Sequence, residues 1–184
     1  MGSEMCIRDR SAMGVIAALY AVLGIGWNVG VDLAALVTAI SAVYVGPVIT
    51  FGAVFVGAFI RYLLGGVPWV TPYTLLEFAL WDGSVWTINA TVYWAIVRKK
   101  EIKKLDIDII KYWIFLIPLM IFIHWAALFL VEAIPRYPWE GVIAKILVSM
   151  ATWYPTTIVS IIFGVIVGES LYISTLARYT AGRR

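Results

Sequence analysis

Long apolar segments separated by short breaks fill almost the whole chain. One stretch, VYVGPVITFGAVFVGAFIRYLLGG at 43–66, holds a Gly46-Pro47 break followed by a helix-length apolar segment that carries Gly52 and Gly57. About 20 apolar residues suffice to cross a bilayer, and a Gly-Pro pair favours the end of one helix and a reversal of the chain. The pattern predicts an all-α, polytopic membrane protein with short loops and no separate soluble domain for a catalytic site.

Glycine and proline breaks divide the chain into about six predicted membrane helices. The last apolar stretch, 142–178, is too long for one straight span, and Pro155 is expected to divide it into a short outer helix and a final crossing. The first five predicted helices run roughly over 11–26, 32–45, 48–64, 73–97 and 107–133.

Basic residues give the expected orientation. One cluster lies in the RKKEIKK segment, 98–104, and another follows the last helix, with Arg178, Arg183 and Arg184. Because Lys and Arg concentrate on the cytoplasmic side of membrane proteins, both clusters are predicted to be cytoplasmic. Two crossings separate the clusters, so both termini are expected inside, and the loops near 27–30, 67–72 and 134–140 outside.

Composition supports a lipid environment. Of 184 residues, 62% are hydrophobic and 14% are charged, whereas soluble domains are about one quarter charged. The net charge of +3 lies mostly at loop ends, which fits anionic lipid and argues against nucleic-acid binding. The nine tryptophans and ten tyrosines fit interfacial belts as well as the lining of a ligand cavity.

The first ten residues require a separate interpretation. MGSEMCIRDR at 1–10 matches the translation of a widely used sequencing-library adapter, so we expect a non-native tail preceding one membrane domain over 11–184. The single cysteine, Cys6, lies in this tail. Disulfides, thiol catalysis and cysteine-ligated metals are therefore not expected.

Ionisable residues within membrane segments are costly, and they are functional candidates for that reason. Most of them lie toward the predicted outer face, which suggests a cavity open to the outside. Each also has a structural alternative: extension of Arg61 to the outer lipid headgroups or its pairing with Glu77, an N-cap at Asp32, polar contacts between helices, or a satisfied core histidine at His124. The residues expected to bind a ligand are Asn28, Arg61, Glu77, Asp82, Asn89, His124, Trp125, Trp153 and Tyr154.

Enzyme motifs are missing from the sequence. No Gly-rich phosphate loop, HExxH pair or nucleophile elbow occurs, and the carboxylates are scattered. A single histidine argues against a metal site. We therefore expect neither catalysis nor a cofactor nor a metal.

A stripe of small residues runs along the first predicted helix. Gly14, Ala17, Ala21 and Gly24 recur at intervals of three and four, which places them on one face. Small residues allow a second helix to approach closely. The stripe is thus a candidate docking surface for a partner helix.

With these features the chain resembles the substrate-binding S components of energy-coupling factor (ECF) transporters, which take up vitamins. The six-helix layout is similar, 17–21 resembles the family's AxxxA motif, and 43–66 resembles its GPxxGxxxG stretch. The resemblance covers about residues 12–180. Family members often carry an acidic residue after the glycines of the third helix, where this chain has Arg61.

The resemblance implies a function and partners. An S component binds a vitamin-like molecule from outside and docks through its first helix onto a transmembrane T component with two cytoplasmic ATPase subunits. The implied location is a prokaryotic plasma membrane, with no nucleic-acid partner. Because acidic candidates outnumber Arg61, a flat, neutral or cationic heteroaromatic ligand is expected.

Two other functions remain open on the sequence. A structural or assembly subunit would have its cavity packed by tryptophans, whereas a buried His124 and Glu77 would favour ligand binding. A stand-alone secondary transporter would need a coupling carboxylate near the membrane midplane, and Asp82 is the candidate.

Overall fold

The computed structural model describes residues 2–29, 32–67, 72–98, 107–127, 138–152 and 154–181. These residues form seven α-helices and one 3₁₀ helix, with no strand among them, so the predicted all-α fold is confirmed. The elements are α1 (Gly2–Leu23), η1 (Gly24–Val29), α2 (Leu33–Tyr44), α3 (Pro47–Leu63), α4 (Pro72–Val97), α5 (Ile107–Ala127), α6 (Trp139–Ala151) and α7 (Tyr154–Ala181).

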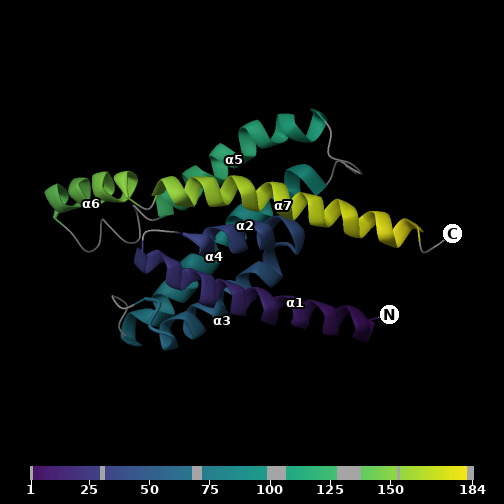
Figure 1. The fold of residues 1–184 in the computed structure, drawn as a ribbon, viewed down its shortest axis with the longest axis horizontal. Coiled ribbons are helices and arrows are strands. Elements are labelled where there is room, and N and C mark those ends of the chain that lie inside the picture. Colours follow the sequence, from purple (N-terminus) through teal and green to yellow (C-terminus); the bar gives the residue numbers. More distant parts are fainter. Residues whose placement is uncertain are drawn as a thin grey trace.

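The helices other than α6 alternate in direction. The beginning of α1 and the end of α7 lie at the same end of the molecule, and α6 extends away from the bundle at the opposite end (Figure 1). Contacts agree with this path: Arg98, directly after α4, binds the carbonyl of Val43 near the end of α2. We call this end the terminal end and the opposite one the cavity end.

Two proline breaks lie where the sequence predicts them. Gly46 precedes α3 with a φ of 92°, and Pro47 begins the helix; glycine accepts this backbone conformation without strain, and proline suits the first helical position. Pro155 is the second residue of α7, and α6 ends at Ala151. The division of the last apolar stretch is therefore confirmed.

The structure has fewer candidate membrane spans than the six crossings that the sequence predicts. Among the described residues, three helices contain spans long and apolar enough to cross a bilayer: Asp9–Gly26, Ile109–Ala126 and Tyr154–Thr175. Two shorter apolar helices are α2 and α3, with 12 and 17 residues. At 1.5 Å per residue a 12-residue helix covers about 18 Å, less than the roughly 30 Å hydrocarbon core, so α2 does not cross it alone. These criteria give a membrane protein with fewer full spans than expected.

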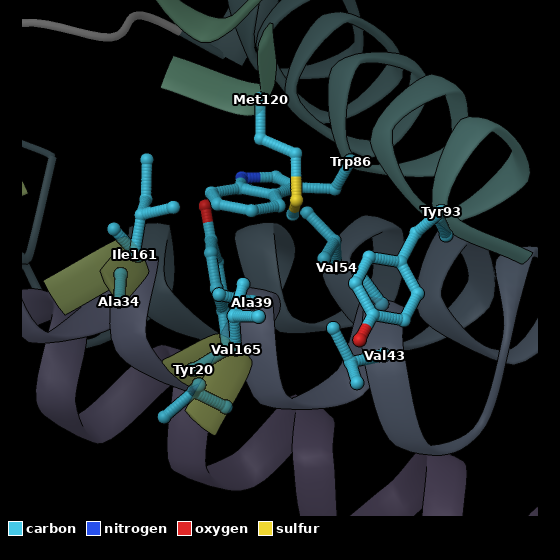
Figure 2. Packing of buried hydrophobic residues seen from close by; sticks show 14 of the residues in the cluster. Tyr20, Ala34, Ala39, Val43, Val54, Trp86, Tyr93, Met120, Ile161 and Val165 are labelled. Atoms are coloured by element: carbon cyan, nitrogen blue, oxygen red, sulfur yellow. The ribbon is translucent and has the colours of Figure 1, made fainter. Parts of the chain in front are cut away.

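Glycines bring two pairs of helices into close contact. A Cβ atom added at Gly57 on α3 would lie 2.8 Å from the Ala17 carbonyl oxygen on α1. One added at Gly164 on α7 would lie 2.8 Å from the Leu36 carbonyl oxygen on α2. The core between these helices is formed by small residues together with larger side chains such as Trp86, Tyr93 and Met120 (Figure 2).

The small-residue stripe of α1 mostly faces this interior. Ala17 and Ala21 are buried, and Gly57 packs directly on Ala17. Gly24 is buried against the Arg61 side chain, and only Gly14 is exposed. The expected placement is therefore corrected: close approach by α3 within the chain explains the small residues at 17 and 21, and these residues present no open surface to a partner.

Candidate functional site

A cluster of buried polar and aromatic side chains lies at the cavity end and surrounds a small cavity. Five helices contribute to it: α1, α2, α3, α4 and α5. The lining residues are Tyr20, Asp32, Ala34, Ala35, Arg61, Phe78, Trp81, Asp82, Trp86 and His124. Two carboxylates, a guanidinium group and an imidazole thus share one site within a largely apolar protein.

Asp82 is bound by a tyrosine from another helix. The Tyr20 hydroxyl on α1 donates a hydrogen bond to Oδ2 of Asp82 on α4, and both side chains are buried. Tyr20 lies between Ala17 and Ala21 on the face of α1 that packs on α3. The small residues on that face therefore also position the tyrosine over the site.

Asp32 has a structural role as well as a place in the cavity wall. Its Oδ1 accepts a hydrogen bond from the Ala35 amide at 3.1 Å, which caps α2 as expected. Its Oδ2 accepts a hydrogen bond from the Thr157 hydroxyl at 2.6 Å. The carboxylate thus ties the beginning of α2 to the beginning of α7 beside the cavity.

Arg61 is buried near the end of α3, with 1% of its surface exposed. Its Nε donates to the Gly66 carbonyl at 3.3 Å, and its guanidinium carbon lies 5.7 Å from the centre of the Tyr20 ring. Added Cβ atoms at Gly24 and Gly66 would both lie within 3 Å of its side chain. Two glycines therefore make room for this arginine, and it does not extend outward to lipid headgroups.

His124 completes the cavity from α5. Its ring lies 5.5 Å from the Trp86 ring, centre to centre. Neither its Nδ1 nor the Trp81 Nε1 has a hydrogen-bond partner among the described residues, although both atoms are buried. Most buried polar atoms in folded proteins are hydrogen-bonded, so these two mark the cavity as unusual.

The structure brings only some of the predicted site residues together. Arg61, Asp82 and His124 line the cavity. Asn89 is buried farther along α4, outside the lining, and Glu77 is exposed. Tyr154 and Trp125 pack together beside the cavity, where the Tyr154 hydroxyl donates to the Ile121 carbonyl at 2.9 Å. Trp153 and the side chain of Asn28 lie outside the described residues.

Four important lining residues were not among the predicted binding residues. Trp86 shares a helix face with Asp82, and helical spacing alone could have selected it. Tyr20 lies beside Ala17 and Ala21 on α1, but small residues at this spacing indicate helix packing and do not point to a ligand site. The sequence predicts an N-cap at Asp32. Trp81 lies four residues after Glu77 on the same helix face, and Glu77 is exposed.

The cavity itself is small. Its volume is about 20 Å³, room for about one water molecule. Small-molecule sites usually enclose about 300–1,000 Å³. A vitamin-sized molecule therefore requires the lining side chains to move apart.

A second buried polar cluster closes the terminal end. Arg98 forms an ion pair with Glu169 at 2.7 Å and donates to the Val43 carbonyl at 2.7 Å. The Tyr93 hydroxyl donates to the other Glu169 oxygen at 2.8 Å, and the Tyr172 ring lies 3.4 Å from the arginine. These contacts join α2, α4 and α7 and leave Glu169 fully buried.

Comparisons with known proteins give no relative. No protein-family model, curated protein or solved structure matches the chain.

Proposed function

We propose that this chain is a membrane-embedded, substrate-binding subunit that captures a flat, neutral or cationic heteroaromatic molecule at its cavity end. The observation that carries the proposal is the buried group formed by Asp32, Asp82, Arg61 and His124 beside two indole rings. Such subunits act in ECF-type vitamin uptake, the family that the sequence resembles.

The cost of burying these groups supports ligand binding. Ionisable side chains within membrane proteins are rare and usually functional. A cluster that served only to hold helices together would be expected to satisfy its hydrogen bonds internally. Here the buried His124 Nδ1 and Trp81 Nε1 lack partners among the described residues and are available to a ligand.

The charges around the cavity favour a neutral or positively charged ligand. Two carboxylates, Asp32 and Asp82, face one permanent cation, Arg61. Flat rings suit this lining because Trp81 and Trp86 offer stacking surfaces and attract cations through their π faces. The carboxylates then offset a positive charge on the ligand.

The partners and location belong to the same proposal. We propose that the chain lies in a prokaryotic plasma membrane and that a transmembrane T component with two cytoplasmic ATPase subunits supplies the energy. Ala17 and Ala21 are buried and offer no open docking face. Partner binding is therefore expected elsewhere on the exposed surface.

A vitamin panel tests the binding function. Purified protein is titrated with vitamins and their precursors, and quenching of tryptophan fluorescence reports binding. Asp82→Asn is expected to weaken binding by well over tenfold, since loss of a charged partner in a desolvated site costs about 2–5 kcal/mol. Glu77→Gln makes the same chemical change at an exposed position of the same helix and is expected to bind normally. Equal loss in both variants would contradict the assignment.

The small cavity favours one alternative, an assembly subunit without a small ligand. The cavity, whose lining includes Trp81 and Trp86, has a volume of only about 20 Å³. That function predicts that no compound quenches fluorescence at concentrations up to millimolar. It also predicts that Asp82→Asn alters only stability.

A further inference from the structure

The buried polar face of α4 continues beyond the cavity. Asp82, Trp86, Asn89 and Tyr93 follow one another at intervals of three and four residues and share one face. All four side chains are buried. Asp82 and Trp86 line the cavity, whereas Asn89 lies one turn farther toward the terminal end, outside the lining.

Asn89 is buried without a hydrogen-bond partner. Its exposed fraction is 0%, and neither Oδ1 nor Nδ2 finds a partner among the residues that the structure describes. A buried carboxamide with both atoms unpaired is destabilising, and a helix contact would be served as well by an apolar side chain. The interhelical role considered for this residue therefore lacks its contact.

Trp86 separates Asn89 from the cavity along α4. Asn89 lies three residues beyond Trp86 and seven beyond Asp82, which correspond to about 4.5 Å and about 10.5 Å along the helix axis; a single heteroaromatic ring spans the shorter distance. Trp86 and Met120 belong to the same core cluster (Figure 2), and methionine repacks readily because its side chain is flexible. Movement of Trp86 against Met120 would open the cavity toward Asn89.

We infer that Asn89 is the inner end of the ligand site and that it is reached when Trp86 moves aside; this inference rests on the proposed binding function. A carboxamide pairs best with an edge that presents one donor beside one acceptor, as it does with adenine. The ligand class is accordingly a heteroaromatic ring with an amino or ring N–H group next to an acceptor nitrogen or oxygen. This edge is neutral, so its hydrogen bonds to Asn89 would act in addition to the charge interaction with Asp82.

Two matched probes test the inner site on the full chain in detergent. 4-Aminopyrimidine carries the donor–acceptor edge, and 4-methylpyrimidine replaces the amino group by a methyl group of similar size that donates nothing. Binding is measured by tryptophan quenching and by the shift of the unfolding midpoint. We expect the amino compound to bind at least about tenfold more tightly, since sites built for a hydrogen bond reject analogues that lack it.

Asn89→Leu is the decisive variant. It is expected to abolish the preference for 4-aminopyrimidine while the protein without ligand unfolds at the same or a higher temperature, because an unpaired buried amide has been removed. Ser149→Ala is the matched control: Ser149 Oγ on α6 is also buried without a partner, but it lies outside the cavity lining. This control is expected to keep the preference.

Several results would overturn the inner site. Equal binding of the two probes, no binding of either, or an unchanged preference in Asn89→Leu would each do so. A panel ligand that needs Asp82 but binds equally well to Asn89→Leu removes the inner site and leaves the proposed function. Absence of any panel ligand removes both.

Discussion

Single buried polar residues set the chemistry of this protein, and their hydrogen bonds differ between its two ends. At the terminal end, Glu169 has both oxygens bound, by Arg98 and Tyr93. In the cavity lining, His124 Nδ1 and Trp81 Nε1 have no hydrogen-bond partner among the described residues. A satisfied cluster rigidifies a fold, and an unsatisfied one is a candidate for binding. Arg98 Nε also lacks a partner among the described residues, but both oxygens of the buried Glu169 carboxylate are bound, which fits a structural role for the terminal end.

The Tyr20–Asp82 hydrogen bond is expected to stabilise the cavity end. Tyr20→Phe removes the hydroxyl and leaves a buried carboxyl without that donor, which should cost about 1–3 kcal/mol. Tyr44→Phe is the control, because the Tyr44 hydroxyl makes only a part-buried bond with Thr175 at 3.2 Å. Denaturant unfolding in detergent measures both. A larger loss in Tyr44→Phe than in Tyr20→Phe would contradict this assignment.

The Arg98–Glu169 pair gives a sharper prediction at the terminal end. Removing one partner leaves the other buried and uncompensated, which usually costs about 3–5 kcal/mol. Glu169→Met and Arg98→Met should therefore each lower the unfolding free energy strongly. The double variant Arg98→Met, Glu169→Met should lose less than the sum of the single losses. Additive losses would show that the two groups do not act as a pair.

At the level of elements, glycine determines how closely the helices pack. Gly57→Ala places a methyl group 2.8 Å from the Ala17 carbonyl oxygen, so we expect it to push α1 from α3 and to lower the unfolding temperature. Gly14→Ala on α1 is the matched control, since no atom lies within 4 Å of its added Cβ. Alanine there should be neutral or stabilising by about 0.5–1 kcal/mol. Equal effects of the two substitutions would exclude close α1–α3 packing.

Several helix ends were predictable because local chemistry determines them, whereas the first helix, expected over 11–26, is α1 at Gly2–Leu23. The Gly46-Pro47 turn, the Asp32 cap and the break at Pro155 all occur where the sequence indicated them. Packing partners were not predictable in the same way. The stripe at Ala17 and Ala21 showed that some helix approaches closely, but spacing cannot distinguish α3 of the same chain from a partner protein.

The site was predictable in part for the same reason. Arg61, Asp82 and His124 were selected because charge within an apolar segment is visible in the sequence, and all three line the cavity. Glu77 was selected for the same reason, yet it is exposed. It lies five residues before Asp82, and this spacing places the two side chains on different faces of the helix. Tyr20 carries no formal charge and comes from a distant helix, so only the fold reveals it.

For the whole molecule, the alternating helices predict which side of the membrane each end faces. The basic segment of the sequence begins at Arg98, directly after α4, which ends at the terminal end, where α1 also begins and α7 ends. Because basic loops remain cytoplasmic, the terminal end is expected inside and the cavity end outside. A ligand would then enter from the external medium.

Cysteine labelling on intact cells tests this orientation. Cys6, the one cysteine of the chain, is first replaced by serine, and single cysteines are then placed at Leu64 and Thr180. Leu64 directly follows α3 at the cavity end and is 52% exposed, so an impermeant maleimide should label it from outside. Thr180, near the end of α7, should react only after the membrane is permeabilised. External labelling at both positions would refute a shared cytoplasmic end, and reversed labelling would place the candidate site on the cytoplasmic side, where capture from outside is impossible.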